Sequence, residues 1–279
     1  MSYKDLLVHV DESKSCVKRI EAAIRLADAH DAQLTGVCVM PEPSAFAYAV
    51  HLPAEVLETL SREATERAES VLKGFAGAAE RAGIAYATRM DRGVDVELPE
   101  ILAVHARHAD LIVLGQVDAD DPAVRHRSLP EEVTLNSGRP TLIVPYIGAA
   151  ATVGERVTVA WNASREAARA VGDAMPLLER AKAVTVVSVN PRFDRFGHGE
   201  QPGADIAVHL AKHGVKVEVE RLEATDIDVP NAILSRLADS GSDLLVMGCY
   251  GHSRLREMVL GGVTRTILHD MTVPVLMAH

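Results

Sequence analysis

The chain repeats itself, and this internal duplication restricts its possible folds more than any other feature of the sequence. Asp5–Ser13 reads DLLVHVDES and Arg156–Ser164 reads RVTVAWNAS, so both halves open with a short apolar segment that runs into a polar turn. A second pair of segments is closer still, since residues 109–115 read ADLIVLG and residues 242–248 read SDLLVMG. The sequence therefore predicts two copies of one domain in tandem.

Each half reads as an alternation of strands and helices. After the opening strands, we predict strands over 33–40, 84–90, 109–115 and 139–145 and their counterparts over 183–190, 216–222, 242–248 and 273–278. Helices are predicted after each opening strand and over 54–82, 96–107, 202–214, 230–240 and 263–269. Such alternation indicates parallel strands joined by right-handed crossovers. The predicted fold class is α/β, with two tandem open parallel five-stranded sheets flanked by helices, of the Rossmann-like, HUP type associated with nucleotide binding.

The boundary between the halves falls in a short segment of small residues. Residues 148–154 read GAAATVG, which places the predicted domains at 1–148 and 154–279. A linker this short favours halves that pack together, so we expect an intramolecular pseudo-dimer, like a homodimer fused into one chain. Whether two such tandem chains also form a homodimer is left open.

Helix starts and buried faces can also be predicted. Ser13 and Ser164 stand where a serine hydroxyl would accept hydrogen bonds from the first free amides of the next helix. Helical spacing predicts three buried faces, made by Val17, Ile20, Ile24 and Ala27, by Ala167, Val171, Ala174 and Leu178, and by Val56, Leu57, Leu60 and Ala64.

Composition narrows the class of protein. Hydrophobic residues make up 48% of the chain but aromatic residues only 4%, so the cores must be built from aliphatic side chains. This suits parallel sheets that are covered on both faces. The net charge of −10 and the lack of a basic stretch argue against a nucleic-acid partner.

The sequence also predicts a cytoplasmic location. The three cysteines, Cys16, Cys38 and Cys249, form no C-x-x-C pair, which fits a reducing compartment. The opening residues, MSYKD, do not have the layout of a signal peptide. No apolar run approaches the roughly 18–20 residues needed to span a bilayer, so we expect no membrane partner.

A glycine-rich segment of the second half is the main candidate for ligand chemistry. It reads GCYGHSRLREMVLGGVT and begins at Gly248, where a buried strand ends. Gly248 and Gly251 let backbone amides approach a ligand closely. Gly261 and Gly262 precede a helix, whose free amides and dipole favour anions. Glycines after strands can be ordinary turn residues, but this arrangement, with the hydroxyl of Thr264 nearby, favours a phosphate cradle.

This segment resembles the loop of the universal stress protein family, whose ATP-binding members carry Gly-x2-Gly-x9-Gly-[Ser/Thr]. Gly248, Gly251 and Gly261 match that spacing, and the resemblance extends over nearly the whole chain, twice. It implies the strand order 3-2-1-4-5, a nucleotide between the ends of the first and fourth strands, and pairing of the last strands of the two halves. It also implies that Asn162 contacts the adenosine and that Val187 offers its backbone to the adenine.

Two departures from the family pattern affect this interpretation. Gly262 stands where the family has Ser or Thr, so one hydroxyl for the phosphates is missing, and Thr264 is the residue that would compensate. Asn162 stands where the family has an acidic residue, and it keeps hydrogen-bonding capacity without the charge. We still expect ATP as the nucleotide, with Mg²⁺ accompanying its phosphates.

The first half keeps the acidic residue, Asp11, but not the glycines. After Gly115 its loop reads QVDADDP. The carboxylates of Asp118, Asp120 and Asp121 would repel a triphosphate. We interpret this segment as a solvated acidic loop that has lost phosphate binding, and a divalent metal site is the alternative that the closeness of the acids leaves open.

Other candidate residues have simpler interpretations. His105 and His108 lie three apart on one helix, but two ligands do not make a zinc site, so no metal ligand is assigned. We interpret Cys249 as a packing residue rather than a reactive thiol. The apolar segment 44–57 is either core packing for the following helix or a lid or ligand wall beside the first-half cleft.

No general base, nucleophile or G-x-S-x-G elbow is recognisable, so we assign no catalytic residue and expect at most slow ATP hydrolysis. The leading hypothesis is a cytoplasmic stress-response protein that binds a nucleotide, ATP, in its second half. The alternative is a non-nucleotide ligand-binding or scaffold protein with a remnant glycine loop. A hydrolase or transferase of the wider nucleotide-binding fold group is the third hypothesis.

Overall fold

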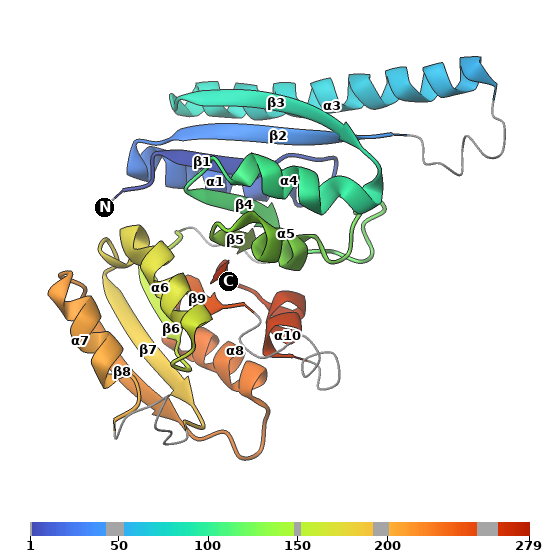
Figure 1. Ribbon diagram of the computed structural model, residues 1–279. Helices are drawn as coiled ribbons and strands as arrows, with labels where there is room; N and C mark the ends of the chain where they lie inside the picture. The colour runs from blue at the N-terminus through green and yellow to red at the C-terminus, as the bar shows by residue number, and fades with distance from the viewer. Residues whose placement is uncertain (1, 43–52, 148–151, 192–200, 250–261) are drawn as a thin grey trace. The chain divides into compact units, whose positions relative to one another are not determined.

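The computed structural model describes residues 2–42, 53–147, 152–191, 201–249 and 262–279. Within these ranges the chain forms two compact units, one comprising Tyr3–Arg139 and the other comprising Pro140–His279 together with the first two residues. Strands and helices alternate in both units (Figure 1), which confirms the predicted α/β class.

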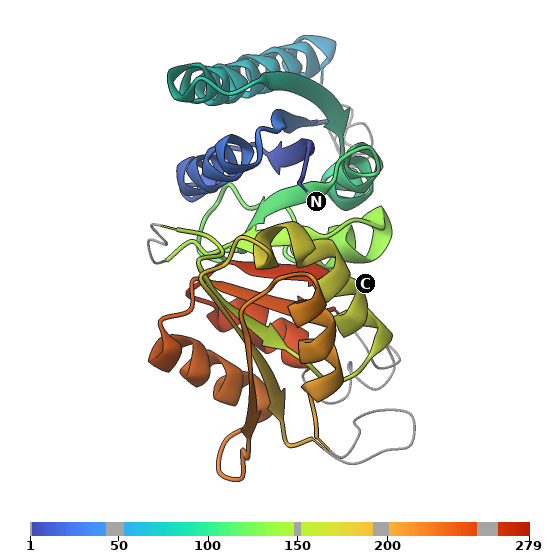
Figure 2. The same cartoon turned by 90° about the vertical axis from the view of Figure 1, so that its left-hand side faces the viewer.

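The first unit is built on parallel strands with helices on both faces. Its strands are β1 (Asp5–His9), β2 (Gln33–Pro41), β3 (Tyr86–Gly93) and β4 (Leu111–Gly115), in the order β3-β2-β1-β4. Its helices are α1 (Cys16–His30), α3 (Ala54–Ala82), the short 3-10 helix η1 (Asp95–Glu97), α4 (Leu98–Ala106) and α5 (Leu129–Ser137). Helix α1 packs beside α3 and α4 beside α5, one pair on each face of the sheet (Figure 2).

The second unit repeats this plan. Its parallel strands are β6 (Arg156–Ala160), β7 (Ala183–Val189), β8 (Val217–Leu222), β9 (Leu244–Gly248) and β10 (Val275–Ala278), in the order β10-β9-β6-β7-β8. Its helices are α6 (Arg165–Leu178), α7 (Ala204–Lys212), α8 (Val229–Ser240) and α10 (Val263–Asp270). Counted within the repeat, this order is 5-4-1-2-3, which confirms the expected order 3-2-1-4-5.

The last strands of the two repeats pair with each other, as expected. Strand β5 (Thr141–Val144) ends the first repeat but belongs to the second unit, where it lies antiparallel to β10 with Ile143 opposite Val275. This pairing explains why the compact units divide after Arg139 and not in the linker. The predicted domain limits, 1–148 and 154–279, stay a prediction.

The two helix caps differ between the repeats. The hydroxyl of Ser164 accepts a hydrogen bond from the amide of Ala167 at 3.1 Å, so the predicted cap of α6 is confirmed. The predicted cap at Ser13 is wrong, because α1 begins only at Cys16. The Ser13 hydroxyl instead donates to Asp11 at 2.5 Å, and the resulting turn delays the start of the helix.

The predicted buried faces are correct for α6 and partly wrong elsewhere. All four predicted residues of α6 are buried: Ala167, Val171, Ala174 and Leu178. Val17 is 64% exposed, because the buried stripe of α1 runs through Cys16, Ile20 and Ala23 instead. Val56 and Leu60 are 41% and 44% exposed, since the buried stripe of α3 begins only at Ala64. The first turns of α3 run beyond the sheet (Figure 1).

The cores are aliphatic, as the composition predicted. Buried residues of the first core include Leu7, Val37, Leu102, Ile112 and Val133, and those of the second include Ile143, Ile233, Leu245, Ile267 and Val275. The aromatic ring of Phe75 is buried over Gly36 of β2, where an added Cβ would lie 2.7 Å from the ring. No described helix combines the length and the apolar character that crossing a membrane requires.

Candidate functional site

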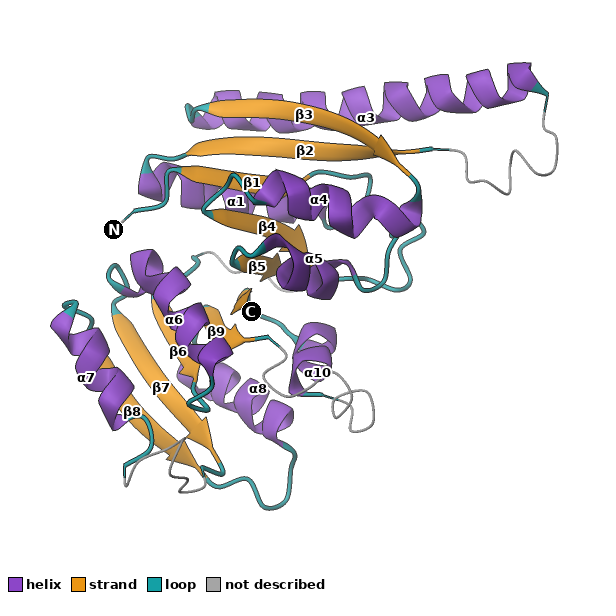
Figure 3. Cartoon of the chain, viewed as in Figure 1, coloured by secondary structure: helices purple, strands orange, loops and turns teal. Residues whose placement is uncertain are grey.

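The parallel strands of each unit end at one edge of the sheet (Figure 3), and Asn162 and Gly248 lie where β6 and β9 reach this edge. In the first unit the amide of Val10 donates to the carbonyl of Val37 at 2.8 Å. In the second unit the amide of Trp161 donates to the carbonyl of Val187 at 2.8 Å. These equivalent hydrogen bonds allow the two repeats to be aligned residue by residue.

The turn after the first strand has the same geometry in both repeats. The amide of Ser13 donates to Oδ1 of Asp11 at 3.0 Å, and the amide of Ser164 donates to Oδ1 of Asn162 at 3.1 Å. Asp11 and Asn162 therefore occupy one structural position, as their places in the sequence repeats predict. The difference between them is the charge that Asn162 lacks.

In the second unit, strand register brings the start of the glycine segment beside this turn. Ala160 of β6 lies opposite Met247 of β9, so Asn162, two residues past β6, and Gly248, the last residue of β9, lie at neighbouring strand ends. Gly248 also packs tightly against α6, because a Cβ at this position would lie 2.6 Å from the amide nitrogen of Ala167. The close approach of helix and strand is therefore one reason for glycine here.

Of the other residues predicted to contact phosphate or adenine, the structure describes Gly262, Thr264 and Val187. Gly251 and Gly261 lie outside the described residues. Gly262 is the N-cap residue of α10, and the first amides of a helix have no partner within it. The side chain of Thr264 is buried, at 3% exposure. Val187 is also buried, and its carbonyl oxygen is used by the hydrogen bond between β6 and β7 noted above.

Cys249 and Cys38 are packing residues rather than reactive thiols. Cys249 is fully buried in the second core, which confirms its interpretation as a packing residue. Burial raises the pKa of Cys38 to about 12, so its thiol stays protonated at neutral pH. Among the residues that the structure describes, no group of three or more His, Cys, Asp or Glu side chains could hold a metal ion.

The first unit contains a cavity of about 80 Å³ at the equivalent edge. It lies between the ends of β1, β2 and β4, the middle of α3 and the segment that links β4 to α5. The polar side chains that line it include His9, Asp11, Arg19, Arg125 and His126. The predicted lid or ligand wall, residues 44–57, lies outside the described residues except for the start of α3 and the residue before it.

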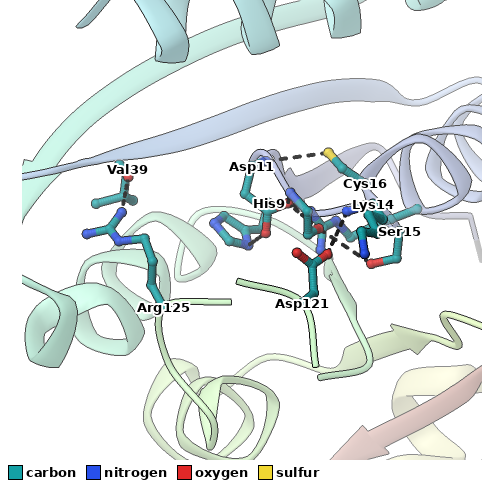
Figure 4. Close-up of polar contacts among 10 residues, drawn as sticks. His9, Asp11, Lys14, Ser15, Cys16, Val39, Asp121 and Arg125 are labelled. Atoms are coloured by element: carbon teal, nitrogen blue, oxygen red, sulfur yellow. Dashed lines mark hydrogen bonds and ion pairs between the residues drawn. The ribbon is translucent and has the colours of Figure 1, made fainter. Parts of the chain in front are cut away.

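A buried ionic cluster forms the floor of this cavity. Nη2 of Arg19 donates to Oδ1 of Asp11 at 2.7 Å, and the Arg19 side chain is only 4% exposed. The other carboxylate oxygen of Asp11 lies 3.5 Å from Nδ1 of His9 (Figure 4). An added Cβ on Gly115 would lie 2.5 Å from the guanidinium, so the glycine that ends β4 leaves room for Arg19.

The cluster has defined charges at neutral pH. The pKa of His9 is lowered from 6.5 to about 4, mainly by burial, with smaller lowering contributions from the guanidinium groups of Arg19 and Arg125 that Asp11 opposes. Burial alone would raise the pKa of Asp11, but Arg19, His9 and the hydrogen bond from Ser13 outweigh it and hold that pKa well below its usual value. His9 is therefore neutral and Asp11 is charged.

Hydrogen bonds join the segment between β4 and α5 to residues at or after the ends of three strands. Oδ2 of Asp121 accepts a hydrogen bond from the amide of Lys14, after β1, at 2.8 Å. The guanidinium of Arg125 donates to the carbonyl of Val39 at 2.6 Å and to that of Gly93 at 3.2 Å, near the ends of β2 and β3. Figure 4 shows Asp121 beside Lys14 and Arg125 at Val39.

The prediction of a solvated acidic loop is therefore wrong for one of its three acids. Asp121 is only 5% exposed, and hydrogen bonds from the amides of Lys14 and Ala123 hold its pKa below the usual value. Asp120 is exposed, and its amide donates to the carboxylate of Asp118 at 3.0 Å. Capping of backbone amides, rather than solvation, accounts for the burial of Asp121.

The sequence reasoning missed His9, Arg19 and Arg125. A signal for Arg19 was available, since it lies three residues after Cys16 and four before Ala23, both of which are buried on α1. An arginine on that stripe predicts a buried acidic partner. Comparison of the two halves gives a second sign, because the residue that matches the charged Arg19 in the second half is the apolar Ala170.

Comparison with known proteins agrees with this fold. A universal stress protein from Archaeoglobus fulgidus DSM 4304 is 18% identical, with 98% of this chain and 96% of that chain covered and a TM-score of 0.76. A functionally unknown protein from Pseudomonas aeruginosa PAO1 is 14% identical, with 99% and 92% covered and a TM-score of 0.58. At these identities the likeness is one of fold.

Sequence similarity over nearly the whole chain identifies the family. A universal stress protein from Synechocystis is 42% identical over 67 residues, which span 24% of this chain and 22% of that protein. The profile of the universal stress protein family matches this sequence twice, over residues 2–145 and over residues 154–279. Because these two matches cover nearly the whole sequence, the chain belongs to the universal stress protein family.

Proposed function

We propose that the second half binds a nucleotide, with ATP as the expected one, at the carboxyl edge of its sheet. The observation that carries the proposal is the register of β6 and β9, which starts the Asn162 turn and the glycine segment from neighbouring strand ends. In open parallel sheets, ligands bind in the crevice outside these ends. The free amides at the start of α10 add a site that favours phosphate.

Each predicted residue has a role in this proposal. The phosphate contacts are the backbone amides of Gly248, Gly251, Gly261, Gly262 and Thr264. Thr264 is assigned its amide because its side chain is buried. Asn162 would meet the adenosine through Nδ2, since its Oδ1 accepts from Ser164. Val187 on β7 is proposed to contact the adenine. Mg²⁺ would be bound through the phosphates, with no protein residue assigned as its ligand.

The competing function is a scaffold or a binder of another ligand, in which the glycine segment is a remnant. The uncharged Asn162 and the glycine at 262 favour it, because each removes a group that ATP-binding members of the family carry. Both versions keep a cytoplasmic stress-response role, which rests on family membership and on the three free cysteines. The intramolecular pseudo-dimer also stays part of the proposal.

Titration of ATP–Mg²⁺ into the full chain, followed by calorimetry and thermal unfolding, tests the proposal. Nucleotide at about 100 times its Kd should stabilise the protein by roughly 2.7 kcal/mol. Gly251→Val should abolish the effect, because a branched Cβ restricts the backbone and fills the cradle. Gly172→Val is the control, since an added Cβ on this exposed α6 glycine meets nothing within 4 Å.

Two results would overturn the proposal in different ways. Wild-type affinity in Gly251→Val would mean that the glycine segment is not the phosphate site. No stabilisation of the wild type, together with no nucleotide released from the purified protein on denaturation, would favour the scaffold function.

A further inference from the structure

The second half is built without the His9–Asp11–Arg19 cluster, and the buried acid near its equivalent turn, Glu166, pairs with Arg165 instead. His9 and Arg19 are 4% and 3% exposed, and they stand where the second half has Ala160 and Ala170. Burying an imidazole and a guanidinium costs free energy that burying alanine does not. The fold alone therefore does not account for these two residues in the first half.

Three side chains of the first-half cavity carry a buried nitrogen that has no hydrogen-bond partner among the described residues. These atoms are Nδ1 of His9, Nε of Arg19 and Nδ1 of His126. The distance of 3.5 Å from Nδ1 of His9 to Asp11 is too long for a well-formed hydrogen bond. In the described ranges the only other such atom is Oγ1 of Thr141, which is in the second unit.

This concentration of unpartnered nitrogens indicates the chemistry of a ligand. Buried polar atoms are normally paired, so three in one cavity point to a bound group with oxygen acceptors. Nε of Arg19 can only donate, and a neutral histidine can donate from Nδ1. An acceptor-only group such as a carboxylate would satisfy Nε of Arg19 and Nδ1 of His9. Nδ1 of His126 is not needed as a donor, because Nε2 of that ring faces the Glu132 carboxylate at 3.7 Å.

The cavity lining offers guanidinium groups to an anion. Three arginines, Arg19, Arg67 and Arg125, line the cavity with two acids, Asp11 and Glu12, and Asp95, outside the lining, pairs with Arg125 at 2.6 Å. Asp11 does not repel an anion strongly, because its charge is compensated by the ion pair with Arg19 at 2.7 Å.

The apolar part of the cavity lining and the cavity volume restrict the polarity and size of the rest of the ligand. Apolar side chains that line the cavity include Val39, Met40, Val71, Leu98 and Leu129. With about 10–15 Å³ for each water-sized group, a cavity of 80 Å³ has room for about five to eight such groups. This volume suits a small ligand with a short apolar body.

We propose that the first-half cavity binds a small monocarboxylic acid, as its carboxylate, with a short apolar body. The carboxylate accepts hydrogen bonds from Nε of Arg19 and from Nδ1 of His9. The apolar body packs against Val39 and Leu98. This site is separate from the nucleotide site and does not depend on it.

Titration of isovalerate and of its neutral analogue isovaleramide into the full chain tests the chemical class. Calorimetry should show one isovalerate bound per chain, with the amide at least tenfold weaker because it presents an NH₂ group to nitrogen donors. Equal binding of the two compounds, or no binding of either, would overturn the proposal. This comparison uses the wild-type protein and does not depend on how any variant folds.

A variant that carries the second-half residues tests the site. The triple change His9→Ala, Asp11→Asn and Arg19→Ala reproduces a combination that the second half already folds with. Isovalerate binding should weaken at least tenfold in this variant and be unchanged in Arg107→Ala, a control at an exposed ion pair with Glu100. Unchanged binding in the triple variant would overturn the site. Gly251→Val should keep isovalerate binding whether or not it binds ATP.

Discussion

Asp11 and Asn162 show how one position can serve different purposes in two repeats. Both side chains accept a backbone amide two residues later and so shape the same turn. Only Asp11 carries a charge, and only the first half supplies Arg19 to compensate it. Because a buried carboxylate without a partner is costly, the acid and the arginine must be gained or lost together.

Arg19→Ala should therefore destabilise the protein through Asp11. We expect the free energy of unfolding to fall by about 2–4 kcal/mol, less than the loss of a fully buried pair because the Asp11 side chain is 25% exposed. Adding Asp11→Asn should recover at least half of this loss. Urea unfolding of the single and double variants measures both effects, and a double variant no more stable than Arg19→Ala would contradict the coupling.

His9 predicts a pH dependence of stability. Its pKa of about 4 in the folded protein is below the ordinary 6.5, so between these values the unfolded chain binds more protons. Stability should therefore fall on acidification through this window, by up to about 3 kcal/mol. The depressed pKa of Asp11 adds a further loss at more acidic pH, below the ordinary Asp value of 3.8.

The variant His9→Ala isolates the imidazole contribution. Urea unfolding at about pH 4.5 and pH 7 should show a smaller difference in this variant than in the wild type, whatever its absolute stability. Equal pH dependence in the two proteins would mean that His9 does not titrate as described.

At the scale of single elements, local sequence patterns predicted where helices begin and end better than which of their residues are buried. The limits of α3 were predicted at 54–82, where the structure has Ala54–Ala82. The burial of Val56 and Leu60 was not, because helical spacing identifies an apolar face but not whether a neighbour covers it. The Ser13 cap failed for a related reason, since Asp11 competes for the same turn.

The contact between β9 and α6 makes a prediction about Gly248. Gly248→Ala should cost about 1–3 kcal/mol of stability, because the new Cβ would lie 2.6 Å from backbone atoms of α6 that cannot turn aside. Gly172→Ala, in the same helix, should be neutral or stabilising by up to about 1 kcal/mol. Thermal unfolding compares the two, and a Gly248→Ala protein as stable as the wild type would contradict this packing.

At the scale of the whole molecule, the repeat predicted two copies of one α/β domain, and the family resemblance implied the strand order and the pairing of β5 with β10. The first-half site was not predictable in the same way, because its contacts join residues far apart in the sequence. Asp121 binds the amide of Lys14, which lies 107 residues earlier, and Arg125 reaches Val39, which lies 86 residues earlier. The sequence QVDADDP by itself does not show whether its acids bind distant backbone groups or are exposed to solvent.

The central claim is a division of labour, in which the second half binds a nucleotide and the first half does not. Hydrogen exchange of the full chain with and without saturating ATP–Mg²⁺, followed by mass spectrometry, tests it most directly. We predict slower exchange in peptides covering 156–170 and 248–270 and no change in those covering 5–19 and 111–129. Protection of the first-half peptides, or of no peptide at all, would contradict the account.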